Sequence, residues 1–247
     1  MSSSDTIYGL HAVRFMLERH APRVRSVYLA EGRGDPRGRA IEELARRHDR
    51  PVRRIDSQAL RKLVGDVAHQ GVAAEIAPLP QWNEDDLLTA LQEARMPLLL
   101  ALDGVQDPHN LGACLRSADA CGALAVIVPR DRAAQLTATV RKVAVGAAET
   151  TPVVVVTNLV RTLKLLKEAG LWVVGADAAA EKAAHEIDLK GPLVLVLGAE
   201  GSGLRQLTQQ NCDFMVRLPQ RGAVESLNVS VAAGMLLYEA LRQRGNA

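Results

Sequence analysis

The stretch from Leu193 to Leu204 reads LVLVLGAEGSGL, and it joins a strand signal directly to a turn signal. Its first five residues are all apolar, which is typical of a strand that is buried on both faces. Glycines then occupy positions 198, 201 and 203, where they let the backbone turn sharply and approach a ligand closely. A buried strand that ends in a glycine-rich turn indicates a parallel α/β sheet with a ligand site at its carboxyl edge.

The same pattern continues on either side of this stretch. Short apolar runs predict further strands at Leu98–Leu102, Ala123–Val128, Val153–Val156, Leu171–Ala176 and Phe214–Leu218. Helices are expected at Leu111–Cys121, Thr137–Ala148, Asn158–Ala169 and Val229–Arg244. Strands and helices that alternate along the chain predict an open, doubly wound α/β fold over residues 97–247.

Residues 1–77 form a second region of shorter elements. Helices are predicted there at Ile7–Glu18, Arg39–His48 and Ser57–Val64, and strands at Val24–Leu29, Val52–Ile55 and Val72–Ile76. Two prolines and an acidic cluster follow in residues 78–86, so residues 78–96 are predicted to be a linker and lead-in segment. The chain therefore divides into a small domain, a linker and a larger domain.

Composition narrows the class of protein. The 247 residues are 48% hydrophobic and 23% charged, which excludes a disordered or fibrous chain. No apolar run approaches the ~18–20 residues of a membrane span, and the first residues lack the features of a signal peptide. We therefore expect a cytoplasmic protein without a membrane partner.

Several kinds of chemistry lose support because their motifs are absent. The sequence contains no G-x-G-x-x-G, no P-loop and no G-x-S-x-G motif. Its three cysteines form no C-x-x-C pair, and its six histidines form no H-x-x-x-H pair. We therefore expect no metal, no disulfide framework and no ordinary dinucleotide or nucleotide-hydrolysing site.

Charge is distributed unevenly along the chain. Residues 1–80 contain 14 Lys and Arg against 10 Asp and Glu, whereas residues 81–247 contain 16 against 18. The surplus of the first region is nearly all arginine, which suits contact with phosphate. Arg33, Arg37 and Arg39 are candidate RNA contacts, although a solvated charged loop explains them equally well.

Three polar loops follow predicted strands of the larger domain, at Asp103–Gly112, Gly198–Gly203 and Leu218–Asn228. Each residue in them has a local explanation. Asn110 and Asn228 could cap the helices that follow them, and Arg116 could pair with Asp119 across one helical turn. Similarly, Glu200 could be an exposed acid, and Ser226 could bond its own backbone. The alternative is a ligand site at the sheet edge, in which Arg116 reaches a phosphate and Glu200 holds a hydroxyl or amino group.

Together the loops resemble the three motifs of the SpoU (TrmH-like) RNA ribose 2′-O-methyltransferases of the SPOUT superfamily. Asn110–Ala118 matches Asn-x-Gly-x-x-x-Arg-(Ser/Thr)-Ala, Leu197–Leu204 matches Leu-Gly-x-Glu-x-x-Gly-Leu, and Ser226–Ala232 matches Ser-Leu-Asn-Val-Ser-Val-Ala. In the first region, Ile7–Val13 and His69–Val72 resemble the small L30e-like RNA-binding domain of one branch. That branch methylates a guanosine in large-subunit ribosomal RNA.

This resemblance implies a fold and a partner that the hydrophobic pattern does not show. The parallel sheet is expected to carry a deep trefoil knot at its carboxyl end, where S-adenosylmethionine binds, and two chains are expected to pair as a homodimer. The implied activity is 2′-O-methylation of a guanosine in the peptidyl-transferase region of 23S ribosomal RNA, with the free RNA or a large-subunit precursor as partner. Transferred by position, the cofactor contacts are Gly198, Leu218 and Leu227, and the catalytic set is Asn110, Arg116, Glu200, Ser226 and Asn228.

The role of Arg116 needs a physical argument. The family proposal makes this residue the general base, but arginine has a pKa above ~12 and stays charged. Our hypothesis is that Arg116 clamps the phosphate beside the target ribose while the proton leaves to that phosphate or to water.

Three other functions stay open at this point. The same chemistry on tRNA is disfavoured by the first domain, and an inactive RNA-binding assembly factor is disfavoured by the intact motifs. A small-molecule α/β enzyme leaves the basic first domain without a role.

Overall fold

The protein was analysed as a computed structural model that describes residues 5–32, 36–77, 82–223 and 226–245. The chain divides into two compact units, Met1–Pro78 and Leu79–Ala247, and each is described by itself. Three sequence-based expectations lie partly outside the described residues: Arg33, residues 78–81 of the predicted linker, and residues 224–225 of the third loop.

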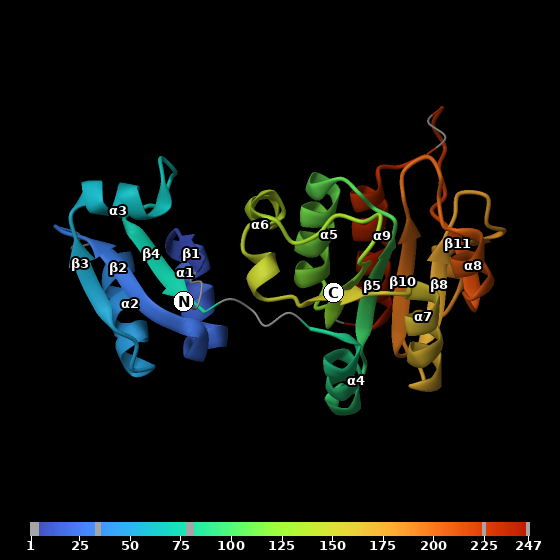
Figure 1. The fold of residues 1–247 in the computed structure, drawn as a ribbon, viewed down its shortest axis with the longest axis horizontal. Helices are drawn as coiled ribbons and strands as arrows, with labels where there is room; N and C mark the ends of the chain where they lie inside the picture. The colour runs from blue at the N-terminus through green and yellow to red at the C-terminus, as the bar shows by residue number, and fades with distance from the viewer. Residues whose placement is uncertain (1–4, 33–35, 78–81, 224–225, 246–247) are drawn as a thin grey trace. The chain divides into compact units, whose positions relative to one another are not determined.

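The second unit is built on a seven-stranded sheet whose strand pairs are all parallel (Figure 1). The strand order is β7-β6-β5-β10-β8-β11-β9. The strands are β5 (Leu98–Asp103), β6 (Ala125–Pro129), β7 (Val153–Val156), β8 (Trp172–Ala176), β9 (Lys182–Ala183), β10 (Leu193–Gly198) and β11 (Phe214–Arg217). The helices are α4 (Glu84–Glu93), α5 (Pro108–Ala120), α6 (Ala138–Ala144), α7 (Leu159–Glu168), α8 (Gln206–Gln210) and α9 (Val229–Gln243).

Both faces of this sheet are buried, and β5 shows this residue by residue. Leu98, Leu100 and Leu102 belong to the core that contains the buried side chains of α5 and α9. The alternate residues Leu99 and Ala101 belong to the core that contains the buried side chains of α4 and α7. Because side chains alternate across a strand, helices on both faces require an uninterrupted apolar run. The predicted doubly wound α/β fold is therefore confirmed.

One helix predicted in this unit is wrong, and two short elements were not predicted. The helix expected over Thr137–Ala148 is divided, because α6 ends at Val145 and Gly146, which have φ of 51° and 94° and cannot continue a right-handed helix. A short 3₁₀ turn, Ala147–Glu149, follows. The sequence analysis also omitted the short elements α8 and β9.

The predicted linker is shorter than expected. Asn83 accepts hydrogen bonds from the backbone of residues 85 and 86 while Asp86 accepts one from Asn83, so a capping box starts α4. Leu87 is buried in the core of the second unit, and Trp82 forms an isolated bridge with Val154. Residues from 82 onward therefore belong to the second unit. The capping pattern and the apolar face of α4 outweigh the nearby prolines.

The first unit is a four-stranded sheet in the order β1-β4-β2-β3, covered by three helices. Its strands are β1 (Asp5–Tyr8), β2 (Val24–Ala30), β3 (Val52–Ile55) and β4 (Val72–Ile76), and its helices are α1 (Leu10–His20), α2 (Pro36–Arg47) and α3 (Ser57–Val64). The helix predicted over Ile7–Glu18 begins too early, because residues 5–8 pair antiparallel with β4. Gly9, at φ 92°, separates that strand from α1.

Candidate active site

Two cavities lie at the carboxyl edge of the large sheet, and both are lined by Ala199, Glu200, Ser202 and Gly203 of the glycine-rich turn. The first, here called the leucine cavity, has a volume of about 490 Å³. Its lining includes all three predicted cofactor contacts, Gly198, Leu218 and Leu227, together with Ser226. The structure thus brings together residues that are up to 29 positions apart in the sequence.

The turn approaches β10 so closely that only glycine fits at position 198. A Cβ atom added to Gly198 would lie 2.0 Å from the backbone carbon of Gly203 and 2.3 Å from the nitrogen of Leu204. The backbone nitrogen of Gly203 donates to the carbonyl of Ala199 at 2.9 Å, which closes the turn. Gly198 therefore sets the shape of the wall that the two cavities share.

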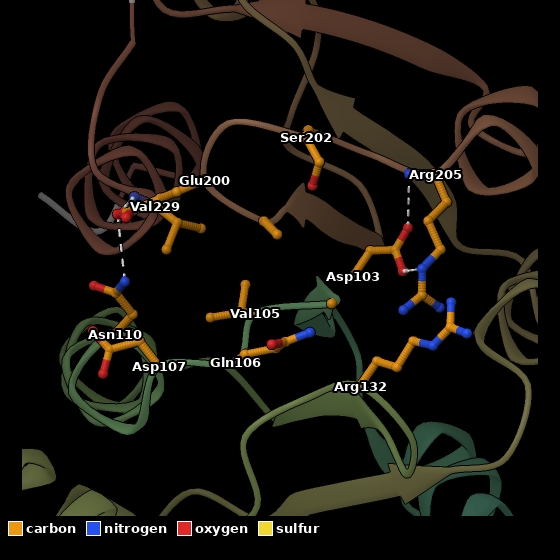
Figure 2. A pocket seen from close by; sticks show the side chains of 13 residues that line it. Asp103, Val105, Gln106, Asp107, Asn110, Arg132, Glu200, Ser202, Arg205 and Val229 are labelled. Atoms are coloured by element: carbon orange, nitrogen blue, oxygen red, sulfur yellow. Dashed lines mark hydrogen bonds and ion pairs between the residues drawn. The ribbon is translucent and has the colours of Figure 1, made fainter.

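A group that we call the carboxylate cluster (Asn110, Glu200 and Asn228) joins the three loops. Oε1 of Glu200 accepts hydrogen bonds from Nδ2 of Asn110 at 3.3 Å, from Nδ2 of Asn228 at 2.5 Å and from the backbone nitrogen of Val229 at 3.2 Å. Nδ2 of Asn228 also donates to Oδ1 of Asn110 at 2.9 Å. Figure 2 shows the contact between Asn110 and Glu200. Three of the five predicted catalytic residues therefore form one hydrogen-bonded cluster.

Asn228 has a local role as well. It is the N-cap of α9, where its Oδ1 accepts from the backbone nitrogens of Ser230 at 2.9 Å and Val231 at 3.4 Å. The cap and the cluster use opposite ends of the same amide. For Asn110 the capping explanation is wrong, because Asp107 is the N-cap of α5.

Arg116 is separate from the cluster in a single chain. It lies on α5 with an exposed side chain and does not line either cavity. The predicted pairing with Asp119 is wrong, since the Asp119 carboxylate accepts instead from the hydroxyls of Thr150 and Thr151. Ser226 is exposed at the rim of the leucine cavity.

The second cavity, here called the arginine cavity, was missed by the sequence analysis. It has a volume of about 410 Å³, and its lining includes Asp103, Gln106, Arg132, Ser202 and Arg205 (Figure 2). Arg132 follows β6 and Asp103 ends β5, so both lie where parallel strands of this sheet end. Their position after strands was the one signal by which the sequence could have revealed this cavity, because Arg132 lies in none of the three motifs.

Other side chains offer little alternative chemistry. Burial raises the pKa of the thiols of Cys114 and Cys212 to about 12, so neither is a ready nucleophile. Within the described residues, no group of three or more His, Cys, Asp or Glu side chains is placed to hold a metal ion. None of the described helices is both long and apolar enough to cross a membrane.

Comparison with known families agrees with this geometry. Residues 97–238 match the SpoU rRNA Methylase family, and residues 6–82 match a family described as RNA 2′-O ribose methyltransferase substrate binding. The first match spans more than half of the sequence, so the chain belongs to the SpoU rRNA methylase family. A related protein, the 23S rRNA (guanosine-2′-O-)-methyltransferase RlmB of Pseudomonas aeruginosa, is 56% identical over 99% of this chain and 98% of its own length.

Solved structures show the same fold. The SpoU methyltransferase AviRb from Streptomyces viridochromogenes, in complex with the cofactor AdoMet, is 25% identical with a TM-score of 0.73 and covers 99% of this chain and 92% of its own. The TrmH/SpoU tRNA modifying enzyme of A. aeolicus is 30% identical with a TM-score of 0.56. It covers only 66% of this chain and 84% of its own.

Proposed function

We propose that this protein transfers the methyl group of S-adenosylmethionine to the ribose 2′-oxygen of a guanosine in 23S ribosomal RNA. The observation that carries the proposal is the similarity to the Pseudomonas aeruginosa enzyme of that printed activity, which extends over nearly the full length of both chains. Residues 1–77 act as an L30e-like RNA-binding domain, and residues 97–247, with α4 packed on the same unit, carry out catalysis in the cytoplasm. The trefoil knot implied by the sequence motifs is part of the same proposal.

The leucine cavity fits S-adenosylmethionine. Its volume of about 490 Å³ lies in the range of small-molecule sites. Leu218 and Leu227 supply apolar walls for an adenine ring, and the carboxylates of Asp177 and Glu200 favour a cationic ligand. The bound cofactor supplies a methyl group that its sulfonium already activates, so the protein needs no metal to transfer it.

The chain's own residues orient the ribose. Glu200 lies in the turn shared by both cavities and accepts a hydrogen bond from Asn228, so a ribose held there has its 2′-oxygen beside the leucine cavity. Asn110 and the backbone of Val229 hold the Glu200 carboxylate in one orientation. Such positioning accounts for a large part of the rate in transfer reactions.

Arg116 completes the site from a second copy of the chain. Its side chain is exposed on α5 and lies outside both cavities of its own chain. On α9, which packs against α5, Val231, Met235 and Tyr238 are 49%, 47% and 56% exposed and lie at helical spacing. An exposed apolar stripe beside an unused arginine supports a homodimer in which Arg116 clamps RNA phosphate in the partner's site.

The first unit supports RNA binding through its basic residues. Arg37 lines a cavity of about 560 Å³ between α1 and α2 together with His11 and Arg14. Arg39 is exposed on the same helix as Arg37. Contacts of these side chains with phosphates make binding depend on salt concentration.

The test is transfer of labelled methyl from S-adenosylmethionine to unmodified 23S ribosomal RNA and, in parallel, to unmodified tRNA. We expect label in one 23S guanosine, mapped by resistance of the following linkage to alkaline cleavage. Label in tRNA alone would contradict the proposed substrate. The A. aeolicus tRNA enzyme covers only two thirds of this chain, which argues against that outcome. Cofactor binding without transfer to free RNA or to a ribosomal precursor would favour the assembly-factor alternative.

A further inference from the structure

The sequence motifs assign no function to the arginine cavity, although it adjoins the carboxylate cluster. Glu200, Asn110 and Val229 line one end of it, and Asp103, Arg132 and Arg205 line the other (Figure 2). The apolar side chain of Val105 and the amide of Gln106 lie between these ends. A molecule whose ribose lies at the cluster therefore extends toward the two arginines.

Arg205 is held in place before any ligand binds. Its backbone nitrogen donates to Oδ2 of Asp103 at 3.0 Å, and its Nε lies 3.5 Å from Oδ1 of the same carboxylate, whose side chain is fully buried. A Cβ atom on Gly104 would lie 3.3 Å from Nη2 of Arg205, so the guanidinium packs against the backbone there. Its two Nη groups make no hydrogen bond within the described part of the chain and are available to a ligand.

The backbone at Arg132 is also held in place, in a conformation that residues other than glycine rarely adopt. Its φ is 56°, in the left-handed region, which costs a residue other than glycine on the order of 1 kcal/mol. Gln135 secures this loop by donating to the carbonyls of Pro129 at 3.0 Å and Ala133 at 3.2 Å. The backbone nitrogen of Ala134 also donates to the carbonyl of Val105 at 2.8 Å, which ties the loop to the cavity wall.

The charges of the cavity indicate what kind of group it receives. Two guanidiniums face three carboxylates, those of Asp103, Asp107 and Glu200, so a phosphate there would meet a net negative lining. Oδ1 of Asp103 is buried and accepts no hydrogen bond from the described residues. A lining that offers both donors and acceptors suits a neutral ligand with both kinds of group.

We propose that the arginine cavity binds the base of the target guanosine, with Arg132 and Arg205 donating to O6 and N7. This inference rests on the proposed function and adds to it the determinant of base choice. Guanine presents O6 and N7 as acceptors, and arginine pairs with them more often than any other side chain does. The N1–H and N2–H groups of guanine donate to the carboxylates and to Gln106, whereas adenine has an acceptor at N1. To enter the cavity, the base leaves its stack in the RNA.

The experiment compares two RNA fragments that carry the mapped target as guanosine or as 7-deazaguanosine, which lacks the N7 acceptor. With the unaltered enzyme, we expect 7-deazaguanosine to lower kcat/KM about tenfold. One of the two arginines contacts N7. In the variant that removes it, either Arg205→Met or Arg132→Met, methylation of the guanosine RNA should be about tenfold slower, and the 7-deazaguanosine RNA should show no further loss. Arg161→Met is the matched control, because Arg161 is exposed on α7 and lines neither cavity.

The inference is overturned if the 7-deazaguanosine penalty persists in both arginine variants. Should the variants also slow both RNAs by one factor and flatten the salt dependence, the arginines contact phosphate instead. Two controls show whether a loss of activity comes from misfolding. One is calorimetric binding of S-adenosylmethionine to the variants, and the other is the conservative variant Arg205→Lys. Failure of the unaltered enzyme to methylate the guanosine fragment would refute the proposed function itself, which is a separate outcome.

Discussion

Glu200 connects the three loops because a carboxylate oxygen can accept several hydrogen bonds at once. Its Oε1 atom receives donors from Asn110, Asn228 and the first residue of α9. Hydrogen bonds to a charged acceptor are stronger than those between neutral groups. The cluster therefore fixes the relative position of three segments that are far apart in the sequence.

Asn228 allows the capping and cluster roles to be separated. A serine at this position can still cap α9, but it lacks the amide that donates to Glu200 and Asn110. We expect Asn228→Ser to leave stability within about 0.5 kcal/mol of the unaltered protein. Its methyl transfer should fall about 10- to 100-fold, because the ribose is no longer positioned.

Thermal unfolding and single-turnover methyl transfer measure the two effects of changing Asn228. The control is Asn228→Ala, which should also lose about 1 kcal/mol of stability with the cap. A serine variant with the full transfer rate would show that the cluster is not needed for transfer.

Gly198 has a steric role that a single methyl group tests. The Cβ atom of Gly198→Ala would lie 2.0 Å from the backbone of Gly203, so the turn must shift. We expect a loss of about 1–3 kcal/mol in stability, together with weakened S-adenosylmethionine binding. Unfolding curves and calorimetry measure these. Gly222→Ala is the control, since no described residue lies within 4 Å of a Cβ atom added there, and its binding should be unchanged.

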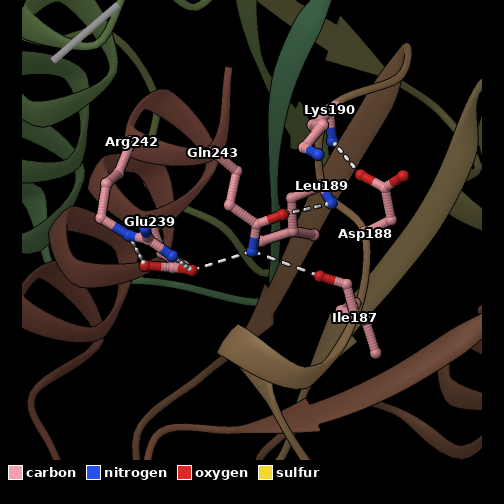
Figure 3. A network of polar contacts seen from close by, with 7 residues as sticks. All are labelled: Ile187, Asp188, Leu189, Lys190, Glu239, Arg242 and Gln243. Atoms are coloured by element: carbon pink, nitrogen blue, oxygen red, sulfur yellow. Dashed lines mark hydrogen bonds and ion pairs between the residues drawn. The ribbon is translucent and has the colours of Figure 1, made fainter. Parts of the chain in front are cut away.

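At the scale of elements, α9 links the site to the opposite edge of the sheet. Asn228 caps its first turn within the cluster, and its last turn binds the segment before β10 (Figure 3). There Gln243 accepts from the backbone nitrogen of Leu189 at 2.9 Å and donates to the carbonyl of Ile187 at 3.2 Å. Glu239 orients this glutamine by accepting from its Nε2 at 2.8 Å.

The Glu239 carboxylate makes this anchor depend on pH. The hydrogen bond from Arg242 is the main cause that lowers the pKa of Glu239 to about 2. A lowered pKa stabilises the fold above the usual value of ~4.3, and that contribution is lost as pH falls toward 2. We expect Glu239→Gln to lower the free energy of unfolding at pH 7 by less than about 1 kcal/mol, because solvent screens the pair.

Denaturant unfolding of both proteins between pH 7 and pH 3 measures this effect. The difference between them should shrink as the pH falls. A difference that stays constant over this range would mean that the Glu239 charge adds nothing to the anchor.

At the scale of the whole molecule, the separation of Arg116 from the cluster is the basis of our proposal that the active unit is a pair of chains. In a two-fold dimer, each site would combine Glu200 of one chain with Arg116 of the other. Either variant alone, Arg116→Ala or Glu200→Gln, should then be inactive. A mixed dimer of the two variants retains one site in which both residues are intact.

Coexpression of the two variants tests this arrangement. Random pairing should restore about a quarter of all sites, and therefore about half of the sites in the mixed dimers once these are isolated. Restored methyl transfer is measured after purification through different tags on the two chains. The control is a coexpressed pair in which both chains carry Arg116→Ala. If the mixed dimers are as inactive as each variant alone, Arg116 and Glu200 act within one chain.

Much of the fold could be predicted because local signals and packing agree. The runs at Val52–Ile55, Val72–Ile76 and Val153–Val156 are strands with the predicted bounds. Predictions failed where a contact distant in sequence competed with a local pattern. Residues 7 and 8 belong to the predicted helix Ile7–Glu18 but pair with β4, and residues 84–93 follow two prolines yet pack as α4.

By itself, the sequence determined the buried parallel strands, the polar loops at their carboxyl ends and the family to which the motifs belong. These properties depend on residue type and spacing, which the chain carries locally. Only the tertiary structure decided that one oxygen of Glu200 joins Asn110 to Asn228, that Arg116 stays apart, and that Arg132 lies beside Arg205 at one end of a second cavity. Those relations depend on how strands adjacent in the sheet, but distant in sequence, place their loops side by side.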